Sequence, residues 1–282
     1  MSKILNSTIG IAGCGTMGLP MLEVLLKNNI NAFGYDIIFK ESFSSLKKNF
    51  ISSKKDFFQK VDVIFSVVRD INQTKELCEG KNGLFQLNSP KTLIISSTLS
   101  PAFLNDFFQN APENITMIEA PMSGAPMKAK DATLTFMVGA EKNQYENILP
   151  ILNILGEKIH HIGKFGSGMS VKVLNNFVAS CSVVAVRHVL SEAKYLNISS
   201  EQLLEILNCS SGKTWFSENI KNIDWAKESY TKENTIGILE KDVNSYLDGL
   251  ENSESETSLA LLNFQKSLLN SLRNIPKFPN ED

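Results

Sequence analysis

The segment GIAGCGTMGLPM at residues 10–21 places three glycines in the spacing G-x-G-x-x-G. The spacing alone is weak evidence, because glycine is common and short patterns recur by chance. Its surroundings are more specific, since a strand-like apolar run ends just before Gly13 and an amphipathic helical pattern begins near Met17. A glycine turn between a buried strand and a helix is the arrangement that binds a dinucleotide. The sequence therefore predicts a dinucleotide site here.

Each glycine of this loop has a separate expected role. Gly13 permits the tight turn, Gly15 lets the backbone approach the pyrophosphate, and Gly18 lets the helix pack on the strand. The N-terminus of the helix then offers N–H groups and a positive dipole end to the phosphates. Asp36 ends the second strand-like run, where a carboxylate binds the ribose hydroxyls and repels a 2′-phosphate. We expect NAD as the cofactor, with NADP left possible by the nearby Lys40.

The first half of the chain alternates short strand-like runs with helical patterns. The runs are rich in Ile and Val and apolar on both faces, which is typical of buried parallel strands. Their alternation with helices predicts a doubly wound sheet. The runs lie at residues 8–13, 31–36, 61–68, 92–98, 115–121, 133–140 and 158–163.

The second half has helical periodicity and no convincing strand. We therefore expect an α/β protein with two domains, an N-terminal Rossmann domain over residues 1–164 and an all-helical domain over residues 165–282. A long helix at about 168–197 links them, after the glycine-rich segment GKFGSG. Residues 173–190 are apolar almost all round, so we expect this helix to be buried within the protein or against a partner subunit.

Composition narrows the function classes. Lys and Arg total 28 against 30 for Asp and Glu, a net charge of -2, so nucleic acid and anionic membrane are not expected partners. The four cysteines form no C-x-x-C pair, which predicts reduced thiols and no metal site. The leader MSKILNS is short for a signal peptide, and no apolar run was expected to reach membrane-spanning length. We expect a cytoplasmic protein.

Three later stretches are distinctive: residues 119–140 (EAPMSGAPMKAKDATLTFMVGA), 166–176 (GSGMSVKVLNN) and 241–250 (KDVNSYLDGL). In the second stretch, Lys172 and Asn176 are four residues apart, so they share one face of a helix and can reach one small ligand. A lone helical lysine is usually a solvated side chain, so these residues alone do not establish catalysis.

Together with the glycine loop and Asp36, these stretches resemble the β-hydroxyacid dehydrogenase family, of the 3-hydroxyisobutyrate dehydrogenase type. The resemblance covers nearly the whole chain, with four motifs in the family's order. It implies that Lys172 is the general acid or base and that Asn176 orients the reacting oxygen. It also implies an oxidoreductase that interconverts a small 3-hydroxy acid and its semialdehyde or oxo acid, in a homodimer or homotetramer.

The resemblance implies further site residues. Ser123, Gly124, Ala125 and Asn175 would contact the substrate, the first three at its carboxylate. Ser97 and Thr98, in SSTLSP, match a turn beside the nicotinamide, and Lys241 would line the same pocket near the cofactor. In the glycine loop the implied cofactor contacts are Gly13, Gly15, Thr16, Met17 and Gly18.

The chain departs from the family pattern at several positions. Glu119 stands where Asp is usual, Ala125 replaces the second glycine of a common SGG, and Ala132 replaces a glycine. Pro126 has no N–H to donate. These changes are expected to stiffen the loop and reshape the carboxylate pocket. The family's Gly- and Asp-bearing C-terminal segment is not recognisable in SLRNIPKFPNED.

The sequence disfavours three other functions. An NADPH-dependent semialdehyde or glyoxylate reductase is disfavoured by Asp36. Imine reductases of the same superfamily commonly replace the catalytic lysine, so Lys172 argues against them. A non-catalytic NAD-binding sensor would have lost the polar site residues, which are present here.

Two pairs of neighbouring residues allow structural interpretations. His160 and His161 adjoin on a strand and point to opposite faces, so a structural role is favoured over one shared site. Trp215 and Phe216 are expected either to lie beside the substrate or to pack within the helical domain. In the apolar helix, Arg187 is expected at an interface or in a buried pair.

Overall fold

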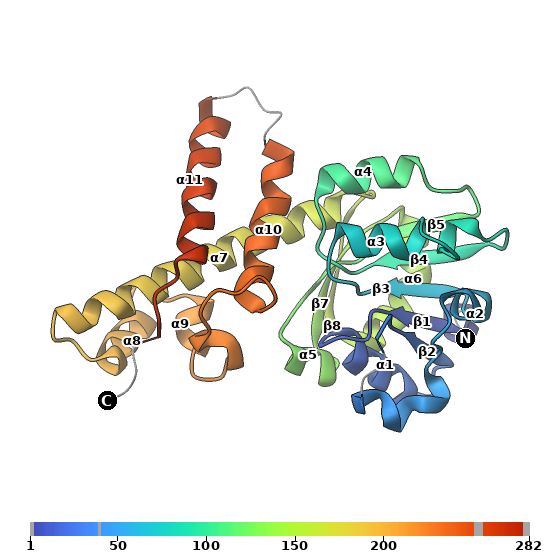
Figure 1. Ribbon diagram of the computed structural model, residues 1–282, viewed down its shortest axis with the longest axis horizontal. Coiled ribbons are helices and arrows are strands. Elements are labelled where there is room, and N and C mark those ends of the chain that lie inside the picture. Colours follow the sequence, from blue (N-terminus) through green and yellow to red (C-terminus); the bar gives the residue numbers. More distant parts are fainter. Residues whose placement is uncertain (1–2, 39–40, 251–255, 279–282) are drawn as a thin grey trace. The chain divides into compact units, whose positions relative to one another are not determined.

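A computed structural model describes residues 3–38, 41–250 and 256–278. The chain divides into two compact units, Met1–Lys172 and Val173–Asp282 (Figure 1). The first unit carries all the described strands, and the second is helical. This order confirms the expected α/β fold followed by an all-helical part. Lys40 lies outside the described residues.

The sheet of the first unit has the strand order β2-β1-β3-β4-β5-β7-β6 among its described strands, with β8 paired to β7. Strands β1 to β5 are mutually parallel, β7 is antiparallel to β5 and β6, and β8 is parallel to β7. The bounds are β1 Ile9–Ala12, β2 Ala32–Tyr35, β3 Val63–Ser66, β4 Lys91–Ile95, β5 Ile115–Glu119, β6 Met122–Ser123, β7 Leu134–Gly139 and β8 Gly156–Gly163.

The strand order reverses at β1, because β2 pairs on one side of it and β3 on the other. On its other side β2 forms an isolated parallel bridge, from Gly34 to Phe50, among the residues that the structure describes. In open parallel sheets, ligands bind outside the carboxyl ends of the strands at such a reversal. The glycine loop follows β1 at this point.

Helices cover both faces of the sheet (Figure 1). One apolar cluster joins the sheet to α1, α5 and α6, and a second joins it to α2, α3, α4 and the first turn of α7. Ser53, Asp70 and Ser100 cap α2, α3 and α4 by accepting backbone N–H bonds. The helices are α1 Gly18–Lys27, α2 Lys54–Lys60, α3 Ile71–Cys78, α4 Pro101–Gln109, α5 Pro126–Lys130 and α6 Lys142–Leu155, with short 3-10 segments at η1 Lys3–Asn6, η2 Glu41–Asn49 and η3 Leu84–Gln86.

The second unit packs around one apolar cluster that includes Val183, Val186 and Leu190 of α7. Its described elements are the greater part of α7 (Ser167–Tyr195), α8 Ser200–Cys209, α9 Trp215–Asn219, the 3-10 segment η4 Asp224–Lys227, α10 Thr235–Leu250 and α11 Glu256–Arg273.

Arg187 is fully buried on α7. Its Nη1 donates to the carbonyl oxygens of Ala226 at 2.7 Å and Glu228 at 2.9 Å, and its Nη2 donates to that of Pro276. These bonds tie α7 to η4 and to the segment after α11. Arg187 was expected either at an interface or in a buried pair. It is buried, and the hydrogen-bond acceptors named above are backbone carbonyl oxygens.

Residues 173–190 of α7 are buried on one side only within this chain, so burial of the other side against a partner subunit stays a prediction. Leu174 is 46% exposed, Val178 66% and Val189 42%, while the opposite side packs into the core of the second unit.

The expectation that no apolar run reaches membrane-spanning length needs correction. An 18-residue window of α7 has a mean hydropathy of 1.5, although core helices also pass this test. Mean hydropathy depends on the composition of the helix and does not show which of its sides packs against other residues.

Glu119, the last residue of β5, ties the sheet to the start of α7. Its carboxylate accepts the N–H of Gly168 at 2.6 Å and of Met169 at 3.1 Å, both in the first turn of that helix. Burial raises the pKa of Glu119 to about 7, against the opposing effect of the backbone N–H groups of that turn.

This pKa makes stability depend on pH. Because the folded-state pKa of Glu119 lies above the ordinary value of 4.5, its contribution to stability is complete below pH 4.5 and is lost as pH rises through about 7. Urea unfolding across this range should show wild type losing about 3 kcal/mol more than Glu119→Gln, which has no such titration. Parallel pH curves for the two proteins would contradict the prediction.

Candidate functional site

Two glycines of the loop after β1 are required by backbone contacts. Gly13 has a φ of +94°, and a Cβ there would lie 2.7 Å from the carbonyl oxygen of Val67. A Cβ on Gly18 would lie 2.0 Å from the carbonyl oxygen of Gly13. The loop therefore approaches the end of β3 and the start of α1 more closely than any other residue type allows.

Gly15 differs from both, because a Cβ there would meet nothing within 4 Å. The N-cap residue of α1, Met17, makes no side-chain cap bond, and Thr16 is exposed. The protein alone gives no steric reason for glycine at this position, whereas close approach of a phosphate to the backbone does. The loop thus fits the pyrophosphate of a dinucleotide.

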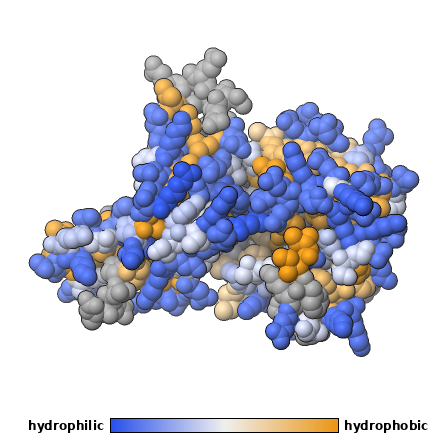
Figure 2. Space-filling model, in the orientation of Figure 1, coloured by the Kyte–Doolittle hydropathy of each residue, from blue (hydrophilic) through white to orange (hydrophobic). Residues whose placement is uncertain are grey.

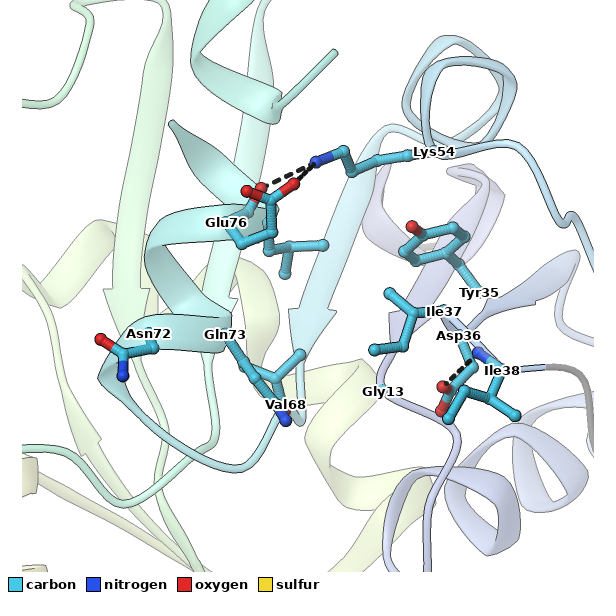
Figure 3. A pocket seen from close by; sticks show the side chains of 11 residues that line it. Gly13, Tyr35, Asp36, Ile37, Ile38, Lys54, Val68, Asn72, Gln73 and Glu76 are labelled. Carbon is cyan, nitrogen blue, oxygen red and sulfur yellow. Dashed lines mark hydrogen bonds and ion pairs between the residues drawn. The ribbon is translucent and has the colours of Figure 1, made fainter. Parts of the chain in front are cut away.

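A cavity of about 410 Å³ opens beside this loop. Figure 3 shows side chains from three sides around it: the end of β2, the start of α2, and α3 with the segment before it. Ile37 and Ile38 are 74% and 60% exposed, which leaves apolar surface for a flat ring. The lining residues are Gly13, Tyr35, Asp36, Ile37, Ile38, Lys54, Val68, Asn72, Gln73, Glu76 and Leu77.

The two charged ends of the cavity are held by specific bonds (Figure 3). Asp36 accepts the N–H of Cys14 at 2.9 Å and that of Ile38 at 3.1 Å, one on each carboxylate oxygen. A carboxylate has about four acceptor sites, so capacity remains for ribose hydroxyls. Lys54 donates to the side chain and the backbone carbonyl of Glu76, at 2.7 and 2.8 Å, so its charge is offset.

Cys14 follows Gly13 in the loop but does not line the cavity, and its thiol donates to the carbonyl oxygen of Ile11 at 3.6 Å. It is 1% exposed, and burial together with the charge of Asp36 raises its pKa to about 12. Cys14 is therefore a packing residue and no reactive thiol.

Ser97 and Thr98 follow β4 at the same edge of the sheet. The Ser97 hydroxyl donates to the carbonyl oxygens of Val68 at 2.6 Å and Ser66 at 3.3 Å, which braces the end of β4 against that of β3. Thr98 is half-buried. The structure thus places both residues at the carboxyl edge that also carries the glycine loop and Asp36.

The expected carboxylate-binding residues lie on the loop after β5. Ser123 is half-buried in the two-residue strand β6, which sequence periodicity did not predict. Gly124 has a φ of +143° and is exposed, and Ala125 is the exposed N-cap of α5. Ala132 has a φ of +56°, a conformation that suits glycine better. Three of the departures from the family pattern, at Ala125, Pro126 and Ala132, therefore lie between β6 and β7, where the chain bends.

Lys172 is only 7% exposed on α7, unlike an ordinary solvated lysine. Asn176 lies one turn further along and is also buried. Lys172 is the last residue of the first unit, and Asn176 belongs to the second.

Within the second unit, Asn176 donates through Nδ2 to Asp242 at 2.5 Å and accepts through Oδ1 from exposed Asn175 at 3.0 Å. Lys241 pairs with the same aspartate at 2.7 Å between Nζ and Oδ1. Asp242 therefore fixes the amide of Asn176 and joins it to Lys241. The sequence analysis assigned no role to Asp242, although it stands in the distinctive stretch at residues 241–250.

The remaining candidates have mainly structural roles. His161 is hydrogen-bonded through Nε2 to the carbonyl oxygen of Ala140 at 2.8 Å, and its ring stacks on Tyr145. Phe216 is fully buried and stacks on Trp225, whereas Trp215 is half exposed.

Two family models match the chain. The first describes the NAD binding domain of 6-phosphogluconate dehydrogenase and covers residues 8–163. The second describes the NAD-binding part of NADP-dependent 3-hydroxyisobutyrate dehydrogenase and covers residues 166–274. Together they span both units.

Named relatives agree with these matches. A probable mitochondrial 3-hydroxyisobutyrate dehydrogenase from Dictyostelium discoideum is 31% identical over 223 residues, 77% of this chain and 69% of that protein. A 2-(hydroxymethyl)glutarate dehydrogenase from Eubacterium barkeri is 29% identical over 216 residues, 74% of this chain and 71% of that protein.

Solved structures share the fold. A 3-hydroxyisobutyrate dehydrogenase from Salmonella typhimurium has a TM-score of 0.79 at 20% identity, covering 96% of this chain and 100% of its own. An imine reductase from Myxococcus stipitatus has a TM-score of 0.65 at 14% identity, covering 96% and 97%. By its sequence matches over both units, the chain belongs to the β-hydroxyacid dehydrogenase family of NAD(P)-dependent oxidoreductases.

Proposed function

We propose that the protein interconverts a small 3-hydroxy acid and its semialdehyde or oxo acid, with Lys172 as the general acid or base. The observation that carries this proposal is a buried lysine one helical turn before a buried asparagine whose amide is fixed by Asp242. A buried, positioned lysine suits proton transfer, whereas a solvated one does not.

Oxidation of an alcohol requires removal of a hydride from carbon and of a proton from oxygen. When bound, the nicotinamide accepts or supplies the hydride. The transfer of the proton has to be carried out by a side chain of the protein. The neutral amine of Lys172 takes it from the hydroxyl during oxidation, and its ammonium form returns it to the oxygen during reduction.

The other site residues that the family resemblance implies have complementary tasks in this proposal. Asn176 orients the reacting oxygen, and Asp242 holds its amide in one orientation. The Ser123 hydroxyl and the backbone at Gly124 and Ala125 bind the substrate carboxylate, assisted by Asn175. When the carboxylate is held in place, the carbon that carries the hydride is also held in one position, which favours hydride transfer.

We propose NAD as the preferred cofactor, at the cavity between β2 and α3. The carboxylate of Asp36 suits ribose hydroxyls and repels a 2′-phosphate. The neighbouring Ile37 and Ile38 bring no cation, and the charge of Lys54 is offset by Glu76. These features disfavour an NADPH-dependent semialdehyde or glyoxylate reductase.

Fluorescence titration tests this preference. Wild type should bind NADH more tightly than NADPH, and Asp36→Ala should weaken NADH binding and reduce the discrimination, because the ribose contact and the repulsion are both lost. Asp56→Ala, an exposed aspartate outside the cavity, is the matched control and should change neither affinity. Tighter binding of NADPH to wild type would refute the assignment.

Steady-state turnover tests Lys172. A screen of short 3-hydroxy acids and semialdehydes, with cyclic imines as the contrasting class, identifies the best substrate. Lys172→Ala should then lower kcat by about 10²–10⁴-fold, the effect of a lost acid or base, while NADH affinity stays unchanged. Lys172→Arg should not restore activity, because guanidinium remains protonated.

The control for Lys172 is Lys194→Ala, an exposed lysine in the last turn of the same helix. It should keep wild-type kcat. Near-full turnover by Lys172→Ala would show that proton transfer occurs elsewhere. A wild-type preference for cyclic imines would favour the imine reductase alternative.

We further propose a cytoplasmic homodimer or homotetramer. The four thiols are free, as in a reducing compartment. Hydrophilic residues dominate the visible surface of the second unit, with hydrophobic groups among them on the α10–α11 pair (Figure 2). On α7, exposed Leu174 and Val178 lie four residues apart on one side of the helix and suit an interface.

Light scattering at micromolar concentration tests the assembly. The wild-type particle should have at least twice the chain mass of 31.3 kDa, and Val178→Glu should shift it toward that mass by placing a charge in the interface. A wild-type particle of 31.3 kDa would refute the oligomer.

A further inference from the structure

Glu119 links two parts of the proposed site that are distant in sequence. Its backbone ends β5 and leads within four residues to Ser123, on the loop assigned to the substrate carboxylate. Its side chain reaches Gly168 and Met169, which precede Lys172 by four and three residues on α7. We propose that Glu119 is a positioning residue that sets the place of Lys172 relative to the carboxylate-binding loop. This inference rests on the proposed role of Lys172.

The carboxylate of Glu119 has little freedom to move. A Cβ on Gly139 would lie 2.0 Å from its Oε1, and a Cβ on Gly168 would lie 2.3 Å from the carbonyl oxygen of Met137. Both glycines therefore make room for the contact between the sheet and the first turn of α7. The position of that turn is defined by close contacts, which leaves little tolerance for displacement.

The same turn is also tied to the segment after β4. The Sδ of Met169 accepts the N–H of Leu99 at 3.4 Å, and both residues are fully buried. Leu99 directly follows Ser97 and Thr98, which are assigned to the nicotinamide side. One turn of α7 thus contacts the ends of β4 and β5, and Lys172 follows it on the same helix.

Stability alone does not explain the choice of a carboxylate at this point. The Oε2 atom of Glu119 is buried and has no hydrogen-bond partner among the described residues. Such a group opposes folding, because its lost hydration is only partly replaced. Its Oε1, however, accepts two N–H groups of the helix N-terminus and holds them in one orientation, which a neutral hydrocarbon side chain could not do. Precise placement of the helix accounts for this arrangement.

The test is a double-mutant cycle between Glu119 and Lys172. Glu119→Gln should lower kcat by about 10- to 100-fold, the effect of a misplaced reacting group, with NADH affinity unchanged. Glu119→Asp keeps the charge but is one methylene shorter, and should also lower kcat. In a Lys172→Ala background neither change should lower kcat further, because there is no lysine left to position.

Two further measurements separate positioning from general damage. Ile118→Val, at a buried residue of the same strand, is the matched control and should keep wild-type kcat. Hydrogen exchange followed by mass spectrometry should show faster exchange at Gly168 and Met169 in both Glu119 variants and not in the control. Circular dichroism checks that each variant folds. If one of the two Glu119 variants does not fold, the cycle is carried out with the other Glu119 variant.

The outcomes distinguish the two proposals. If Lys172→Ala is inactive but both Glu119 variants keep wild-type kcat, the positioning role is wrong and the proposed function stands. Equal losses with and without Lys172 would also overturn positioning, because they indicate general damage. If Lys172→Ala itself turns over normally, the proposed function fails, and the positioning role fails with it.

Discussion

Backbone contact between the end of β1 and the start of α1 is the constraint on which the nucleotide half of the structure depends. The Cβ positions at Gly13 and Gly18 fall on backbone atoms, so neither residue can carry a side chain without moving a strand or a helix. This contact places the N-terminus of α1 at the point where the strand order reverses. It also places the N–H of Cys14 within 2.9 Å of Asp36, so the glycine loop and the carboxylate proposed to bind the ribose are fixed together.

Sequence patterns predicted the parts of the fold that depend on local chemistry. Buried parallel strands are apolar on both faces, so the sequence runs that form them could be recognised. The glycine loop could be predicted because its residues are close together in the sequence. The two-residue strand β6 was not predicted, because it exists only through pairing with β7. The side of α7 that meets the core could not be predicted, since hydropathy does not distinguish the sides of a helix that is apolar almost all round.

The candidate site was predictable to a different extent. The motifs identified Lys172 and Asn176 through their spacing and their resemblance to a family, but spacing could not reveal that Asn176 bonds to Asp242, 66 positions away. The link from Glu119 to Gly168 spans 49 positions and was equally invisible. Such bonds follow from the packing of helices and strands, which local periodicity does not encode.

The two halves of the proposed site are therefore specified in different ways. The cofactor half is built mainly from backbone at the ends of adjacent strands, so its geometry follows from sheet topology. The residues proposed for the chemistry depend on long-range hydrogen bonds: Glu119 holds the turn of α7 that precedes Lys172, and Asp242 holds the amide of Asn176. Strand ends that are fixed by a parallel sheet tolerate change in the residues around them, whereas a lysine held by one turn of a helix does not. Under the proposed function, substrate range can accordingly change through Ala125, Pro126 and Ala132, while the proposed positioning role of Glu119 keeps Lys172 in place.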